Sequence, residues 1–76
     1  MSKERRKTLQ EIYDIIVEAK DNLSAVCDEE TEYKDNMPEN LQNSERYETA
    51  EAAVDALESA VAALEEALDG IEEAKE

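Results

Sequence analysis

Carboxylates are the side chains of this sequence that recur with a regular spacing and could take part in chemistry. Glutamate returns every seven residues, at Glu51, Glu58, Glu65 and Glu72. Seven residues are close to two turns of an α-helix, so these side chains share one face of a helix. We define the helix-two acidic face as Glu51, Asp55, Glu58, Glu65, Glu66, Asp69, Glu72 and Glu73. A row of exposed carboxylates is suited to binding basic groups on a partner.

The sequence contains few of the residue types that catalytic and metal-binding sites need. The sequence has no histidine, one cysteine (Cys27) and one glycine (Gly70). These counts exclude most zinc sites, the usual pairs of nucleophile and base, and glycine-rich phosphate loops. We therefore expect no catalytic residue, no metal, no cofactor and no enzymatic activity.

Two groups of acids in the first half have weaker interpretations. Glu30 falls on an apolar row, where a carboxylate can act as an acid or base, but near a helix end it more often reaches solvent or a basic side chain. The cluster around it lacks the glycine and the ligand spacing of a calcium-binding loop, so at most weak cation binding is expected. Its members are Asp28, Glu29, Glu30, Glu32 and Asp35.

The only basic cluster is Arg5, Arg6 and Lys7. It could bind an anion or an acidic partner. In an antiparallel hairpin it would lie near the C-terminal acids, and an intramolecular role there is the favoured interpretation.

The acidic rows belong to a helix with a nearly continuous heptad repeat. From Tyr47, the first heptad position reads Tyr47, Val54, Val61 and Leu68, and the fourth reads Ala50, Leu57, Leu64 and Ile71. The seventh position is always alanine. This pattern predicts an amphipathic helix over residues 44–75 that packs lengthwise against other helices.

The first half predicts a second helix over residues 3–35, with Ser2 as its N-cap. Its apolar seam is expected at Leu9, Ile12, Ile16, Ala19, Leu23 and Val26. Tyr13, Ile15 and Cys27 widen this seam, and Val17 falls outside it. Residues 36–43 form the connector, because Pro38 disfavours helical geometry at Met37. Met37 and Leu41 are candidates to cover the end of the core, and Asn43 or Ser44 to cap the second helix.

These elements predict one domain, 1–76, with an all-α fold. A connector this short returns the second helix antiparallel to the first, as a coiled-coil-like helical hairpin. The apolar face of the second helix is wider than one partner helix needs. We expect its alanine rows to join two hairpins into a homodimeric four-helix bundle, unless the alanines serve helix propensity alone. The predicted self-association residues are Ala53, Ala56, Ala60, Ala63 and Ala67.

Charge and composition narrow the partners. The net charge of −14 on 76 residues opposes direct binding to nucleic acid or to an anionic membrane. It favours a basic protein as partner. No apolar run is long enough to span a bilayer, and a single cysteine gives no internal disulfide. A cytoplasmic location is the resulting expectation.

The connector carries one resemblance. The stretches DNMPENLQ (residues 35–42) and SERYE (44–48), followed by a helix rich in Ala, Leu and Glu, resemble small uncharacterised acidic proteins of bacterial phages and prophages. The resemblance implies no catalytic or ligand-binding residue. Small phage proteins of this kind are often inhibitors of host machinery, including defence nucleases.

Three functional hypotheses follow. In the first, the protein is a phage-type interaction module that inhibits a basic nucleic-acid-binding or defence protein of the host by binding it through the acidic face. In the second, it is a structural module that only self-assembles. In the third, Arg5, Arg6, Lys7 and the tyrosines bind a small anion or nucleotide.

Overall fold

Two long α-helices account for most of the chain, and the computed structural model describes all residues, 1–76. The first helix, α1, comprises Lys3–Asp35, and the second, α2, comprises Glu45–Lys75. A short 3₁₀ turn, η1 (Glu39–Leu41), lies between them, and there are no strands. The all-α prediction is confirmed, and the predicted helix boundaries agree to within one residue.

A serine side chain caps the start of each long helix. The Ser2 hydroxyl accepts a hydrogen bond from the backbone N–H of Arg5, and the Ser44 hydroxyl accepts one from Tyr47, both at 3.2 Å. Such bonds satisfy N–H groups that have no partner within the first helical turn. Of the two caps considered for the second helix, the structure uses Ser44.

The connector turns the chain within a few residues. Pro38 precedes η1, and α1 ends before it, as the restricted geometry of a residue before proline requires. Met37 is buried and covers the end of the helix interface, as predicted. Leu41 was the other candidate for this role, but its side chain is 36% exposed.

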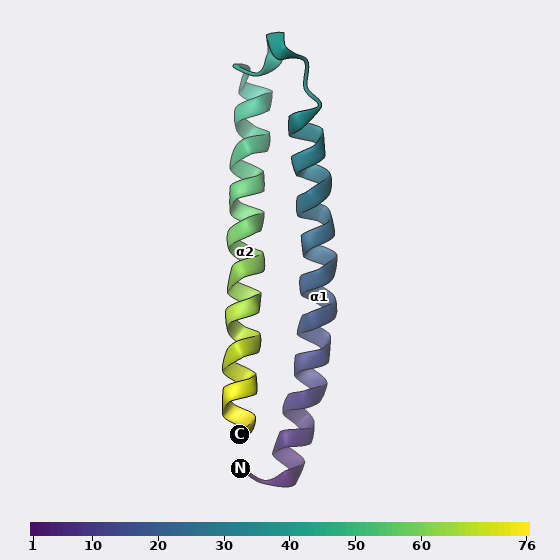
Figure 1. Ribbon diagram of the computed structural model, residues 1–76, viewed down its shortest axis with the longest axis vertical. Helices are drawn as coiled ribbons and strands as arrows, with labels where there is room; N and C mark the ends of the chain where they lie inside the picture. The colour runs from purple at the N-terminus through teal and green to yellow at the C-terminus, as the bar shows by residue number, and fades with distance from the viewer.

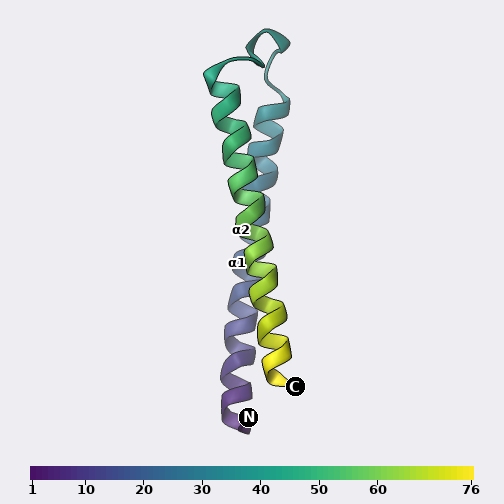
Figure 2. The same ribbon diagram turned by 90° about the vertical axis from the view of Figure 1, so that its left-hand side faces the viewer.

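The two helices form an antiparallel hairpin (Figure 1). They run side by side, with the connector at one end and both chain termini at the other. The molecule is a narrow rod with extents of 59 × 15 × 13 Å. Seen edge-on in Figure 2, the helices cross at a shallow angle, as in coiled-coil packing. Neither helix has a segment apolar and long enough to cross a lipid bilayer.

The core between the helices is small. Only five of the 76 residues are buried, and none of them is completely removed from solvent: Cys27, Met37, Ala50, Val54 and Leu68. In α2 every residue at the first and fourth heptad positions is buried or half-buried, as predicted. The Cys27 thiol lies 4.0 Å from the backbone oxygen of Val54, in the half of the interface nearer the connector.

The prediction for the apolar seam of the first helix was wrong for one of its two rows of residues, Ile12, Ala19 and Val26. Ile12 is 41% exposed, Val26 is 49% exposed, and Ala19 is also exposed. The row one residue further along the chain faces α2 in their place: Tyr13, Lys20, Cys27 and Lys34. Val17, expected outside the seam, is half-buried.

The physical reason for this shift is that long side chains can border an interface without burying their charge. The Lys20 and Lys34 side chains are only 27% and 18% exposed, and their ammonium groups lie 3.5 Å from Asp21 and 4.0 Å from Asp35. Their hydrocarbon stems cover apolar surface while the charged ends reach the rim. The more apolar row of α1 is consequently left in solvent.

Gly70 lies within α2, and the helix continues past it to Lys75. A Cβ atom at Gly70 would meet nothing within 4 Å. The helix therefore does not end at Gly70, and no neighbouring backbone of the hairpin requires a glycine there.

Candidate functional site

The heptad positions sort the exposed side chains into two opposite faces. We label the positions a to g, with a and d at the helix interface, so that Cys27 of α1 and Val54 of α2 are both a positions. Because the two helices run in opposite directions, the e positions of both flank one side of the interface, and the g positions of both flank the other. The b positions lie beyond e, and the c positions lie beyond g.

A groove on one side of the hairpin supports this assignment. It has a volume of about 340 Å³ and is lined by e and b residues of both helices. Ser24, Asp28 and Thr31 come from α1, and Glu58, Ala62 and Glu65 come from α2. Cys27 and Val61, which are a residues, complete the lining. The e and b positions of α1 and α2 therefore share one face.

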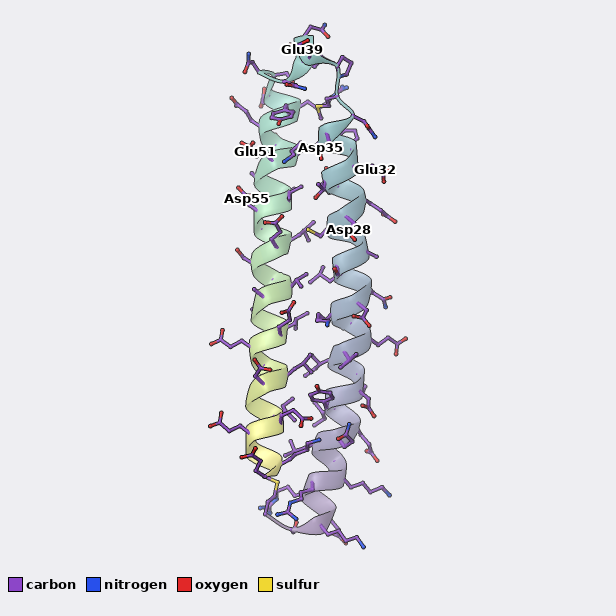
Figure 3. All side chains as sticks on the ribbon, in the orientation of Figure 1. Asp28, Glu32, Asp35, Glu39, Glu51 and Asp55 are labelled. Atoms are coloured by element: carbon purple, nitrogen blue, oxygen red, sulfur yellow. The ribbon has the colours of Figure 1, made fainter.

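This face carries acids from both helices. We define the acidic surface as Asp14, Asp21, Asp28, Asp35, Glu51, Asp55, Glu58, Glu65, Asp69 and Glu72. No lysine or arginine occupies an e or b position between Asp14 and Asp35 or between Glu51 and Glu72. Figure 3 shows Asp28 and Asp35 on α1, with Glu51 and Asp55 on α2. It also shows Glu32 and Asp55 extending outward at opposite edges of the hairpin.

Most of these carboxylates have no basic partner. Three of them lie within 4.0 Å of a lysine: Asp21, Asp35 and Glu72. Asp14 accepts a hydrogen bond from the Gln10 amide at 3.0 Å, and the other six make no ion pair. The ten carboxylates span about 32 Å at 1.5 Å per residue, or about one carboxylate per 3.2 Å. The seven that have no lysine partner give one per about 4.5 Å. A single DNA strand carries one charge per roughly 3.4 Å.

The acidic surface differs from the helix-two acidic face in two ways. Six of the eight predicted residues belong to it, but Glu66 and Glu73 lie at f positions, on the outer edge of α2. The row Asp14, Asp21, Asp28 and Asp35 was missed. Its spacing of seven residues was visible in the sequence, but these b positions indicate a shared surface only when the e and b positions of both antiparallel helices are placed on one face.

The opposite face is almost free of charge. The g positions at its two ends hold Arg5 and Arg46. We define the uncharged face as the g and c residues that lie between these ends: Thr8, Ile12, Ile15, Ala19, Asn22, Val26, Glu29 and Tyr33 of α1, with Thr49, Ala53, Ala56, Ala60, Ala63, Ala67, Gly70 and Ala74 of α2. One of these sixteen residues, Glu29, is charged, although charged residues make up 39% of the chain. All five predicted self-association alanines lie here; Ala53 and Ala60 are half-buried, and the other three are exposed.

The remaining candidate sites are not assembled by the fold. No group of three acids or cysteines is placed to hold a metal ion, so the cluster around Glu30 forms no cation site. Glu30 itself is half-buried and makes no ion pair. Arg5, Arg6 and Lys7 also lie more than 4.0 Å from every carboxylate, so the favoured pairing with C-terminal acids is absent.

The tyrosines do not gather around the basic cluster. Tyr33 and Tyr47 lie near the connector, whereas Arg5, Arg6 and Lys7 lie at the open end of the hairpin. The separation between Lys7 and Tyr33 along α1 is about 39 Å at 1.5 Å per residue. A shared anion site built from these groups is therefore not formed, and only Tyr13 is near the basic end.

No protein-family model, curated protein or solved structure matches this chain.

Proposed function

We propose that the protein is a protein–protein interaction module whose acidic surface binds a basic protein that otherwise holds nucleic acid. The supporting observation is the spacing of the acidic surface along a straight rod: about one carboxylate per 3.2 Å, or one without a lysine partner per about 4.5 Å, compared with one phosphate per roughly 3.4 Å of a single DNA strand. A basic groove shaped for a phosphate backbone would meet a similar row of negative charges here.

The groove adds a place for a basic side chain. Asp28, Glu58 and Glu65 border it, and the hydroxyl of Thr31 lies beside them. The Thr31 hydroxyl donates to the backbone oxygen of Cys27 at 2.9 Å, which leaves its lone pairs available as acceptors. A lysine or arginine of the partner would find charged and neutral oxygen acceptors at one point of the rod.

The resemblance of the connector to phage proteins is part of this proposal. An inhibitor of a host nuclease, or of another defence protein that binds nucleic acid, would act by occupying the groove where the nucleic acid normally lies. A cytoplasmic location, where such partners work, belongs to the same proposal.

The test is capture from nuclease-treated host lysate by immobilised protein, compared with a variant neutralised at the groove: Asp28→Asn, Glu58→Gln and Glu65→Gln. We expect the wild type to retain a nucleic-acid-binding protein that duplex DNA displaces, and the variant to lose it. The matched control neutralises three acids on the outer edges: Glu18→Gln, Glu66→Gln and Glu73→Gln. It has the same net charge and should retain the partner. Equal loss by both variants, or capture that DNA does not displace, would contradict the proposal.

A structural module that self-assembles is the second candidate function, and a homodimer is its simplest form. It is favoured by the exposed apolar residues of the uncharged face, since Ile15 is 67% exposed and Tyr33 is 50% exposed. A binding partner for the acidic surface is not required in this case. Capture of nothing from lysate, together with a stable oligomer in solution, would favour it.

A further inference from the structure

We propose that the uncharged face is the contact between two copies of this chain, packed as a four-helix bundle in which α1 of each copy lies against α2 of the other. This inference goes beyond the binding of a basic partner, because it concerns the opposite side of the hairpin and includes α1 in the interface.

Four large apolar side chains of α1 lie on the uncharged face and are exposed there. Ile12, Ile15, Val26 and Tyr33 are between 41% and 67% exposed, while two lysines occupy positions at the helix interface. A hairpin working alone would gain from the reverse arrangement, because burial of apolar area stabilises the fold. The exposed row is explained if a second surface covers it.

Repulsion between two negatively charged copies also favours contact through this face. A second copy also carries a net charge of −14, so most approaches between copies are repulsive. The uncharged face has one charged residue among its sixteen. If charged residues were as frequent there as in the whole chain, where they make up 39%, about six would be expected. A like-charged copy can approach closely on this side, and contact here keeps both acidic surfaces on the outside.

The sizes of the side chains that α1 and α2 present on this face also favour contact between two copies. On the uncharged face, all four large apolar side chains come from α1, and α2 presents six alanines, Gly70 and Thr49. A twofold axis along the rod places the large row of one copy over the small row of the other, which makes the face complementary to itself. The contacts of Cys27 with Val54 and of Tyr13 with Lys75 set the register of the hairpin. Val26 then lies level with Ala56 and Ala60 of the second copy.

The area of the uncharged face can be compared with the area that stable interfaces bury. From Ile12 to Tyr33 the face is about 32 Å long at 1.5 Å per residue, and two helices side by side are about 15–20 Å wide. The flat area is therefore roughly 480–640 Å² per copy, which reaches only the lower end of the roughly 600–1,000 Å² per partner found in stable interfaces. Each hairpin buries only five residues by itself, so a shared core of this size is a substantial addition.

Sedimentation equilibrium on the full chain at micromolar concentration and about 0.15 M salt tests the oligomeric state. We expect twice the chain mass of 8.6 kDa. A mass that stays monomeric up to about 100 μM would overturn the proposal. It would mean that the binding free energy is weaker than roughly −5.5 kcal/mol, which corresponds to a dissociation constant of about 100 μM.

Two neighbouring alanines provide a matched pair of variants. Ala63 lies on the uncharged face and Ala62 lines the groove on the acidic side, and both are exposed in the hairpin. Ala63→Glu should weaken dimerisation at least roughly tenfold, because it buries an unpaired carboxylate. Ala62→Glu should leave the dimer intact. Ile15→Glu tests α1 in the same way, with Ala25→Glu on the outer edge as its control. An unaltered dimer in both Ala63→Glu and Ile15→Glu, or equal loss in the controls, would place the interface elsewhere.

A distance measurement does not depend on whether these variants fold. With Cys27→Ala as background, a spin label at Asn40→Cys reports the separation of the two connectors. The proposed arrangement puts both connectors at the same end, with labels about 20–30 Å apart for helices roughly 10 Å in diameter. The other face-to-face arrangement pairs α1 with α1 and puts the connectors at opposite ends of a rod 59 Å long. Label distances near that length would overturn the pairing of α1 with α2.

Failure of this proposal is distinguishable from failure of the proposed function. The Ala63→Glu variant leaves Asp28, Glu58 and Glu65 in place, so a monomeric variant should still capture the basic partner.

Discussion

The ammonium group of Lys75 lies 5.3 Å from the centre of the Tyr13 ring, which joins the last turn of α2 to α1 near the open end of the hairpin. The same ammonium donates a hydrogen bond to the Gln10 side chain and lies 3.1 Å from Glu72. It is the only cation–π contact in the molecule. It fastens the end of the rod that has no covalent connection between the helices.

The first prediction follows from this contact. Tyr13→Phe keeps the ring and should leave the free energy of unfolding nearly unchanged. Tyr13→Leu keeps an apolar side chain but removes the attraction between cation and ring, and should lower the free energy of unfolding by about 0.5–1 kcal/mol. Urea unfolding followed by circular dichroism, at one protein concentration, measures both. Equal stability of the two variants would show that Lys75 acts through Gln10 and Glu72 alone.

The second prediction concerns the cap at the start of α2. Ser44→Ala should destabilise the protein by about 1 kcal/mol, because the N–H of Tyr47 loses its acceptor next to the connector. Ser2→Ala removes an equivalent bond at a chain terminus, where opening of the first turn costs little, and should have a smaller effect. Thermal unfolding of the two variants compares them. A larger loss for Ser2→Ala would mean that the helix end near the chain termini controls stability.

The heptad pattern and turn residues were sufficient to predict the hairpin. Ser44, Pro38 and the a and d residues of α2 act locally, through backbone geometry and burial, and they lie where the sequence predicts them. The interface row of α1 was not predictable in this way, because two neighbouring rows were both partly apolar. Ile12 looks like the better core residue when side chains are judged singly. Lys20 occupies the interface because its stem packs there while its charge reaches Asp21, the next residue of the same helix, and this packing of the stem depends on the facing helix.

The acidic surface was half predicted for the same reason. Glu58 and Glu65 were found from one helix, whereas Asp28 joins them only across the groove. No pattern within a single helix shows that these three side chains are neighbours. The relation between them comes from the antiparallel direction of the second helix, and therefore from the connector.

The third prediction concerns the lysine in the middle of the interface. Lys20→Leu should raise the free energy of unfolding by about 1 kcal/mol, because an apolar side chain replaces a partly buried stem and an exposed ion pair contributes little. Lys7→Leu changes the charge by the same amount at an exposed position and should have almost no effect. Chemical denaturation measures both. A loss of stability in Lys20→Leu would instead show that the lysine fixes the register of the two helices.

The fourth prediction concerns repulsion across the groove. The double variant Asp28→Asn and Glu58→Gln removes one like charge from each side of the groove and should raise the melting temperature by a few degrees in about 10 mM salt. The difference from the wild type should shrink in about 0.5 M salt, where screening acts over a few ångströms. Glu18→Gln with Glu66→Gln is the control, since these acids sit on the outer edges. A gain that persists at high salt would point to a packing effect.

Because the acidic surface and the uncharged face lie on opposite sides of the hairpin, a protein bound to one face leaves the other face free to bind. A dimer formed through the uncharged faces would present its two acidic surfaces back to back, pointing in opposite directions. Such a particle is bivalent. It would hold two basic partners at once, at a spacing fixed by the thickness of the bundle, and would cross-link partners that are themselves oligomers. Whether a partner is blocked singly or gathered into larger assemblies then depends on the ratio of the two proteins.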